Sequence, residues 1–330
     1  MNNFIFNEQP GRTAIISGKE FLFFSGYSYL GMQQVPEFIE LVKEGIDKYG
    51  WLFPSSRISN TRLQLYNECE TLLSTITGME DTVLASSGFL AGQLATTLWK
   101  DELINLYPSH PAIYGNNNGS NDHTPKKFAV DSVNMLTADI TDLSLISSGE
   151  NEKIIIVDDS HGIGLIGKNG EGISGNFPKH MNIEYLLSYS LSKAWNIQGG
   201  AVSCSRKIAD DLRLLPAYTA ATAPSPAMLH AFLKGQHLYQ QQREKLQKNT
   251  SYFHSLIQHI KQVSYHPQLP VVILPSTINE YKLHQKNIII SSFAYPDPAG
   301  TKHHRIVLNA LHNFQDLEYL AACLHEIFVD

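Results

Sequence analysis

The sequence has few cysteines, no long apolar run and no cluster of positive charge, and each absence excludes a class of protein. Its three cysteines (Cys69, Cys204 and Cys323) have neither metal-ligand nor redox spacing and no HExxH motif occurs, so we expect no metal site. No apolar run approaches the roughly 20 residues that cross a bilayer, and no basic start with an apolar stretch opens the chain, which favours a cytoplasmic protein. The net charge is −6 and the longest basic run is Lys126-Lys127, so nucleic acids and anionic membranes are poor candidate partners.

Short apolar runs rich in β-branched residues alternate with longer amphipathic stretches along the 330 residues. This alternation predicts an α/β fold, in which helices join the strands of a mainly parallel sheet. Residues 154–158 and 185–190 are two such strands. A Gln-rich and Lys-rich helical stretch over residues 226–260 connects to a smaller α+β pattern, and the length also favours two domains.

The stretch IIIVDDSHGIGLIG is an apolar strand that ends in Asp158, Asp159 and His161. Ligands of open α/β sheets bind at the carboxyl ends of strands, so these side chains are candidates for a site. Gly162, Gly164 and Gly167 also spell GxGxxG, the fingerprint of a nicotinamide-dependent dehydrogenase. That fingerprint requires a helix to begin within the glycines, whereas the glycine-rich KNGEGISGNFP follows here. A turn that the acids simply cap remains an alternative.

Lys193 follows the next predicted strand, in SLSKAWNIQGGA, with Ser190 and Ser192 before it. A lysine at a strand end can form an imine when desolvation or nearby positive charge keeps part of it neutral. Pyridoxal phosphate (PLP) needs such a lysine, and it needs a carboxylate that keeps its pyridine nitrogen protonated. Asp158 and Lys193 supply both groups, and the two serine hydroxyls suit a phosphate.

Four blocks, VDDSHGIGLIG, SLSKAWNIQGGA, SSGFLAGQ and SGYSYLGM, resemble in family order the blocks of the α-oxoamine synthases, which are PLP-dependent transferases of fold type I. The likeness runs from around Gly18 to the carboxy terminus. It implies a large PLP-binding domain over residues 35–225 with a mainly parallel sheet of the seven-stranded type. Residues 226–330 would form the connecting helix and a small α+β domain, which the amino-terminal arm, residues 1–34, joins. The resemblance also implies a homodimer with shared active sites.

The resemblance assigns roles to individual residues. It implies that Asp158 binds the pyridine nitrogen, that His161 hydrogen-bonds the phenolic oxygen of the ring and that Lys193 holds PLP as a Schiff base. His110, in YPSHPAI, resembles the histidine that stacks on the ring.

Phosphate and substrate contacts follow from the same resemblance. The SGF segment, which consists of Ser87, Gly88 and Phe89, resembles the loop that holds the phosphate at a helix start, where unpaired N–H groups attract anions. Thr219 resembles the residue that reaches the phosphate of the partner subunit. Arg305 resembles the arginine that binds the substrate carboxylate, a role that suits its planar guanidinium.

Two segments depart from the family pattern. Tyr27 replaces the asparagine that helps to bind the substrate carboxylate, and only Asp131 can stand for the acid of a motif whose other residues do not match. The resemblance predicts an acyltransferase that condenses an amino acid with an acyl-CoA and releases CO2, similar to 8-amino-7-oxononanoate synthase of biotin synthesis. An aminotransferase, a nicotinamide-dependent dehydrogenase and a non-catalytic PLP-binding homologue remain alternatives.

Overall fold

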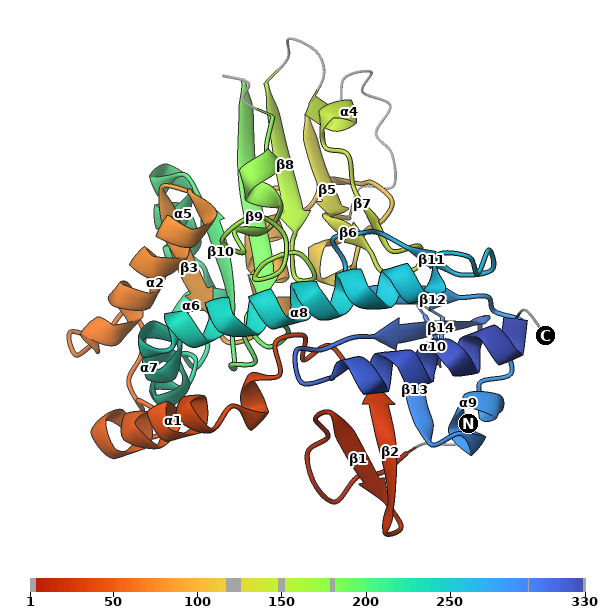
Figure 1. Ribbon diagram of the computed structural model, residues 1–330. Helices are drawn as coiled ribbons and strands as arrows, with labels where there is room; N and C mark the ends of the chain where they lie inside the picture. The colour runs from red at the N-terminus through yellow and green to blue at the C-terminus, as the bar shows by residue number, and fades with distance from the viewer. Residues whose placement is uncertain (1–3, 117–125, 148–151, 179–181, 296, 329–330) are drawn as a thin grey trace. The chain divides into compact units, whose positions relative to one another are not determined.

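The computed structural model describes residues 4–116, 126–147, 152–178, 182–295 and 297–328 (Figure 1). These residues divide into two compact units. The large unit comprises Val35–Asn134 and Ile140–Leu238, and the small unit comprises Met1–Gln34, Met135–Asp139 and Tyr239–Asp330. Each unit contains its own sheet and is described by itself.

The large unit is built around a six-stranded sheet with the order β3-β10-β9-β8-β5-β4. The strands β4, β5, β8 and β9 are parallel neighbours, and β10 is antiparallel to β9 and to β3. Strand β8 reads KIIIVD and is buried over its last four residues, as expected for a parallel strand that is covered on both faces. The bounds of the strands are Asp81–Ala85 (β3), Ile104–Asn105 (β4), Lys127–Asp131 (β5), Lys153–Asp158 (β8), Ile183–Ser190 (β9) and Gly200–Cys204 (β10).

Helices complete the large unit, and α1, α2 and α7 pack together. Helix α3 and helix α5 contribute Ala91, Leu94 and Leu212 to a buried cluster that also contains residues of the sheet. The helical bounds are Pro36–Tyr49 (α1), Gln64–Thr77 (α2), Gly88–Thr97 (α3), Pro111–Ile113 (η2), Ser144–Ser147 (α4), Gly172–Asn176 (η3), Arg206–Leu214 (α5), Pro216–Thr219 (α6) and Pro226–Lys234 (α7). Two short strands, Val133–Asn134 (β6) and Asp139–Ile140 (β7), lie where the chain passes between the units.

The small unit has a six-stranded sheet with the order β1-β2-β13-β14-β12-β11. Only the β2–β13 pair is parallel, so this sheet is mainly antiparallel. The helix α8, Gln236–Ile257, begins in the large unit and continues into the small one. The other bounds are Thr13–Ile16 (β1), Lys19–Phe24 (β2), Met32–Gln34 (η1), Ser264–Tyr265 (β11), Val271–Leu274 (β12), Tyr281–Gln285 (α9), Ile288–Ala294 (β13), Lys302–Val307 (β14) and Phe314–Phe328 (α10).

The structure differs from the sequence prediction in three places. The described residues give the large sheet six strands, one fewer than the seven-stranded type. The helical stretch over residues 226–260 is two helices, α7 and α8, which meet at Gly235. Residues 226–238 group with the large unit because α7 packs against α1 and α2, whereas the sequence places the boundary before residue 226.

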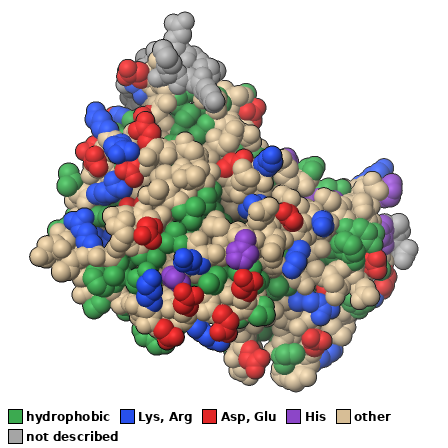
Figure 2. All heavy atoms as spheres, turned by 60° about the vertical axis from the view of Figure 1, so that its left-hand side comes forward, with side chains coloured by type: hydrophobic (Ala, Val, Ile, Leu, Met, Phe, Trp, Pro, Cys, Tyr) green, Lys and Arg blue, Asp and Glu red, His purple; other side chains and the backbone are tan. Residues whose placement is uncertain are grey.

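In the described ranges, no helix has the length and apolar character that crossing a membrane requires. Figure 2 shows basic and acidic side chains interspersed on the visible face of the molecule.

Candidate active site

The carboxyl ends of β5 and β8 bring two acids together in the large unit. Asp131 and Asp158 are Cα partners at the last position of these parallel strands. Asp158 is also paired across the sheet with Ser188 of β9, two residues before that strand ends at Ser190. The sheet therefore gathers the ends of three strands, at the edge where ligands of α/β proteins bind.

Lys193 lies beside His161 at this edge. The Nζ atom of Lys193 is 3.0 Å from Nε2 of His161, although 32 positions separate the two residues in the chain. The loop that carries Lys193 is closed by backbone hydrogen bonds from Leu191 to Gly199 and from Ile197 to Leu191. The amine is thus held by a defined loop next to an imidazole that can exchange a proton with it.

The two acids have different surroundings. Asp158 is 7% exposed, and its Oδ1 accepts a 2.9 Å hydrogen bond from the backbone N–H of Ser160. Asp131 accepts a 2.9 Å hydrogen bond from the backbone N–H of His110. Burial, together with the nearby charge of Asp158, raises the pKa of Asp131 to about 7, against the opposing charge of Lys193. The charges of Asp158 and Lys193 therefore both act on the same carboxyl group.

His110 responds to the same two charges. Its Nδ1 accepts a 3.1 Å hydrogen bond from the backbone N–H of Ala112, so the neutral ring carries its hydrogen on Nε2. Burial lowers the pKa of His110, the charge of Asp158 raises it and the charge of Lys193 lowers it. Asp131 fixes the backbone of His110, which places a mainly neutral ring in this cluster.

A candidate anion site lies at the start of α3. The side chain of Ser87 caps the helix by accepting a 3.1 Å hydrogen bond from Leu90, and a Cβ atom on Gly88 would lie 2.4 Å from Cβ of Ser190. Only glycine allows this close approach. The hydroxyls of Ser190 and Ser192 are 2.8 Å apart, and the side chain of Phe89 is 56% exposed. Backbone N–H groups of the first helical turn and two hydroxyls therefore lie close together, which suits a phosphate.

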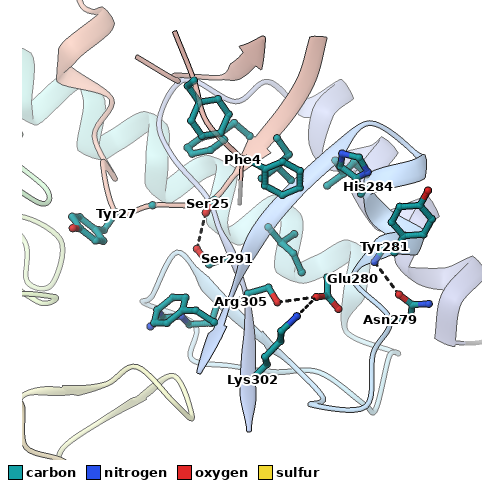
Figure 3. A pocket seen from close by; sticks show the side chains of 18 residues that line it. Phe4, Ser25, Tyr27, Asn279, Glu280, Tyr281, His284, Ser291, Lys302 and Arg305 are labelled. Atoms are coloured by element: carbon teal, nitrogen blue, oxygen red, sulfur yellow. Dashed lines mark hydrogen bonds and ion pairs between the residues drawn. The ribbon is translucent and has the colours of Figure 1, made fainter. Parts of the chain in front are cut away.

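Three other predicted residues lie apart from this cluster in the chain. Thr219 is the last residue of α6 in the large unit, and its carbonyl oxygen accepts a 3.2 Å hydrogen bond from Ser56. Arg305 and Tyr27 belong to the small unit, where both line a cavity of about 720 Å³ (Figure 3). The predicted roles of these residues, like those in the large unit, remain proposals.

The surroundings of Arg305 point to an anion. Its guanidinium lies 4.8 Å from the centre of the Phe293 ring, and its Nη1 is 3.4 Å from the carbonyl oxygen of Met135. Its Nε atom is buried without a hydrogen bond, and no ion pair with an acid occurs among the described residues. Burial lowers the pKa of Arg305. A partly buried cation without a counter-charge is costly, and a bound carboxylate would supply that charge.

The sequence prediction missed the role of Asp159. This residue is fully buried, and it accepts hydrogen bonds from Ser132 Oγ at 2.5 Å and from the backbone of Ile173 at 3.0 Å. Burial raises the pKa of Asp159 to about 7. The acidic pair in VDDSHG was a signal for it, but only the fold shows that the second acid points into the interior.

The dehydrogenase interpretation of GxGxxG is wrong. Within residues 159–178, turns and the short 3-10 helix η3 follow β8, and no α-helix begins within the glycines. A Cβ atom on Gly162 would lie 2.0 Å from Oδ1 of Asp159, and one on Gly172 would lie 1.9 Å from its Oδ2. These glycines make room for a buried carboxylate, so the pattern has a packing cause and gives no pyrophosphate site.

Comparison with known proteins assigns the chain to a family. A family model for aminotransferase class I and II matches residues 136–324, more than half of the chain. The chain belongs to the aminotransferase class I and II family. The predicted enzyme class, a transferase, agrees with this membership. An 8-amino-7-oxononanoate synthase from Aliivibrio fischeri is 26% identical to the chain, over 96% of the chain and 91% of that protein. A synthase of the same name from Fervidobacterium nodosum is 24% identical, over 94% of the chain and 90% of that protein.

Solved structures confirm the predicted fold. A high-resolution structure of SPT with a PLP internal aldimine has a TM-score of 0.82 at 21% identity, with 98% of the chain and 91% of that protein covered. Serine palmitoyltransferase from Sphingomonas wittichii has a TM-score of 0.80 at 20% identity, over 98% of the chain and 91% of that protein. An 8-amino-7-oxononanoate synthase from Francisella tularensis has a TM-score of 0.72 at 20% identity, over 93% of the chain and 98% of that protein. The α/β fold predicted as PLP-dependent fold type I is the fold of these proteins.

Proposed function

We propose that the protein is a PLP-dependent acyltransferase of the α-oxoamine synthase type. It would condense an amino acid with an acyl thioester, with loss of CO2. The observation that carries this proposal is the cluster at the ends of β5, β8 and β9. There, the amine of Lys193 lies 3.0 Å from His161, and its charge acts, together with that of Asp158, on Asp131 and His110.

The residues present fit the cofactor. Lys193 would hold it covalently, the buried Asp158 would bind the pyridine nitrogen and His161 would bind the phenolic oxygen. His110 would lie against the ring. The start of α3 (Ser87, Gly88 and Phe89), the hydroxyls of Ser190 and Ser192, and Thr219 of the partner chain in a homodimer would hold the phosphate. Bound PLP supplies an electron sink that makes the Cα–H bond of a joined amino acid acidic.

Each residue then has a defined task. The amine of Lys193, once released from the cofactor, would take the Cα proton as general base, and His161 could accept or return that proton over 3.0 Å. Arg305 would bind the substrate carboxylate, because its cation has no acid partner among the described residues. Tyr27, 53% exposed in the same cavity, would contact the substrate where the family has asparagine.

The relatives suggest a finer assignment. They are named 8-amino-7-oxononanoate synthases and align over nearly the whole chain, which supports an acyl-CoA as donor and a step of biotin synthesis. We also propose a cytoplasmic homodimer. Size-exclusion chromatography with light scattering tests the dimer, and a monomer at micromolar concentration would contradict it.

An aminotransferase is the second candidate. The family model that matches residues 136–324 is named for that activity, and both reactions use the same lysine, acid and arginine. Transamination would follow if the proton taken from Cα were returned to the cofactor and no acyl group were attacked.

One experiment separates these functions. Purified protein loaded with PLP is mixed with an amino acid and an acyl-CoA, and separately with the amino acid and an oxo acid. Release of free CoA supports the acyltransferase, whereas amino-group exchange without thiol release supports the aminotransferase. A protein that is yellow, but whose spectrum no amino acid changes, is a non-catalytic PLP-binding homologue, and a colourless preparation contradicts both proposals.

A further inference from the structure

Asp159 connects three segments at the edge of the large sheet that carries Lys193. Its side chain is fully buried and accepts hydrogen bonds from Ser132 Oγ, between β5 and β6, at 2.5 Å and from the backbone N–H of Ile173 at 3.0 Å. Its own backbone N–H donates to the carbonyl oxygen of Ser188 in β9 over 2.8 Å. A single residue therefore joins the loop after β5, the loop after β8 and strand β9.

The glycine-rich residues after His161 fold around this carboxylate. Residues 162–173 are called the glycine segment below. At its start, the backbone N–H groups of Gly162 and Ile163 both donate to the carbonyl oxygen of Asp159 over 2.9 Å. Its last residue donates to the carboxylate of the same acid. Both ends of the glycine segment are thus bound to Asp159.

The interior of the glycine segment is closed by its own backbone. The N–H of Gly164 donates to the carbonyl oxygen of Gly170 over 2.8 Å, and the N–H of Gly172 donates to that of Ile166 over 2.9 Å. Gly164 and Gly172 have φ values of +80° and +72°, a backbone conformation that residues with a side chain rarely adopt. The segment is therefore a compact turn between its two contacts with Asp159.

The middle of the glycine segment packs against the loop that carries Lys193. A Cβ atom on Gly164 would lie 2.9 Å from Cβ of Ala194 and 3.0 Å from Nε1 of Trp195, the two buried residues that follow the lysine. His161 directly precedes the segment, and its Nε2 lies 3.0 Å from Nζ of Lys193. The glycine segment therefore contacts the chain on both sides of this pair of nitrogen atoms.

A second acid supports the outer side of the same segment. Glu171 accepts hydrogen bonds from the backbone N–H groups of Lys168 at 3.3 Å and Asn169 at 2.8 Å, and both donors belong to exposed residues. Asp159 and Glu171 are thus two carboxylates that each accept a hydrogen bond from the backbone of one segment, on its buried and its exposed side. This makes Glu171 a matched control for Asp159.

We propose that Asp159 is a positioning residue that fixes the distance between His161 and Lys193 through the glycine segment. Two nitrogen atoms exchange a proton directly only within hydrogen-bond distance, about 2.6–3.2 Å. An amide in place of the carboxylate could accept only one of the two side-chain hydrogen bonds, because its NH2 group is a donor. The inference rests on the proposed function only for the use of this pair in catalysis.

The visible absorption of the full-length, PLP-loaded protein tests the inference. The pH midpoint of the colour change reports the proton at the nitrogen of Lys193, so loss of the neighbouring imidazole in His161→Gln should shift it. We expect Asp159→Asn to shift the midpoint in the same direction, by at least about 0.5 pH units. Glu171→Gln should keep the midpoint of the wild type. An equal shift in Glu171→Gln would overturn the inference, since any loosening of the segment would then suffice.

A double variant shows whether Asp159 acts through His161. If it does, Asp159→Asn combined with His161→Gln should have the midpoint of His161→Gln alone, whereas independent effects add. Additive shifts would overturn the inference. Ser132→Ala removes one donor to the carboxylate and serves as a milder variant if thermal unfolding shows that Asp159→Asn is not folded. A midpoint unchanged in Ser132→Ala and in any folded Asp159→Asn also contradicts the proposal.

Competitive labelling of the full-length protein without cofactor separates this inference from the proposed function. Limiting acetic anhydride is added, and mass spectrometry measures acetylation of Lys193 relative to Lys207, an exposed lysine of α5. Asp159→Asn should lower this ratio by at least about threefold, because the amine loses its proton acceptor. If the ratio falls while the loaded wild type releases no CoA, the proposed function fails and the inference stands. Release of CoA together with an unchanged ratio gives the opposite result.

Discussion

The cluster around Lys193 and the cavity around Arg305 differ in whether buried charges have partners of opposite charge within the protein. In the large unit, Asp131, Asp158, His161 and Lys193 act on one another, and the amine has an imidazole 3.0 Å away. In the small unit, Arg305 has aromatic neighbours and no acid partner among the described residues. The first site is electrostatically balanced by its own residues, whereas the charge of the second would be balanced by the carboxylate that we propose to bind there.

This difference separates two kinds of contribution to function. Residues of a balanced cluster should affect chemistry and its pH dependence, because changing one alters the protonation of the others. A cation without a partner should affect substrate affinity and should lower stability when no ligand is bound. The predictions below test this contrast.

Lys193→Ala should have the largest effect. Loss of the amine removes both the covalent link to PLP and the general base, so we expect turnover to fall at least about a thousandfold. Borohydride reduction followed by mass spectrometry should attach the cofactor to the wild type and not to the variant. Lys168→Ala, at an exposed lysine of the loop after β8, should keep the reduced adduct. An adduct of undiminished yield in Lys193→Ala would place the cofactor elsewhere.

Asp158→Asn should lower turnover by roughly a hundredfold, because an amide cannot keep the pyridine nitrogen protonated. The side chain keeps its shape and can still accept the hydrogen bond from Ser160. Steady-state kinetics and the visible spectrum of bound PLP measure the effect. Asp131→Asn is the matched variant on the neighbouring strand and should reduce turnover less. The reverse order of the two effects would assign the pyridine contact to Asp131.

The pH dependence of stability should reveal Asp131. In the folded protein the pKa of Asp131 is about 7, above the ordinary value of 3.8. The carboxyl group therefore keeps its proton to higher pH when the protein is folded. The contribution of Asp131 to the free energy of unfolding is therefore complete below about pH 4. It is lost as pH rises towards 7, with a slope of up to about 1.4 kcal/mol per pH unit.

Asp131→Asn should remove that part of the slope. Denaturant unfolding between pH 5 and 8 should show the variant gaining stability relative to the wild type as pH rises. Asp159, whose pKa burial also raises to about 7, should leave a residual slope. Asp47→Asn, at an exposed acid of α1, is the control and should follow the wild type. Parallel curves for wild type and Asp131→Asn would show that Asp131 ionises normally.

Arg305→Met should have the smallest effect of these variants, and it should raise the stability of the protein. Replacing a partly buried, unpaired cation by an apolar side chain of similar length should stabilise the ligand-free protein by about 1 kcal/mol. Thermal unfolding measures this change, and kinetics should show a raised KM for the amino acid. A variant that is less stable than the wild type would mean that the protein itself balances the charge of Arg305.

Local sequence patterns predicted the elements that carry the large-unit site. The run IIIVD and the segment YLLSYS gave strands that end within a few residues of their observed ends, β8 at Asp158 and β9 at Ser190. Their burial on both faces makes such runs apolar throughout, and this signal is readable without the fold. The same signal pointed to Asp158 and Lys193 as site candidates, because Asp158 ends an apolar strand and Lys193 follows one.

The same patterns failed where distant segments decide the outcome. The strands β1 and β2 were not predicted; they pair with each other, and β2 also pairs with β13, far away in the chain. The helical pattern over residues 226–260 continued past Gly235, and only the packing of α7 on α1 and α2 assigns its first part to the large unit. The GxGxxG pattern was ambiguous until Gly162 and Gly172 were found against Asp159.

The sequence by itself determined the buried strands β8 and β9 and the acid and amine near their ends, because the apolar period and the identity of a residue are properties of short segments. The tertiary structure decided which charges meet. The pairing of β5 with β8 sets Asp131 beside Asp158, and the register of β2, β13 and β14 sets Phe23 and Arg305 on one face. Such neighbours depend on strand order and register, which arise from packing between segments that are remote in the chain.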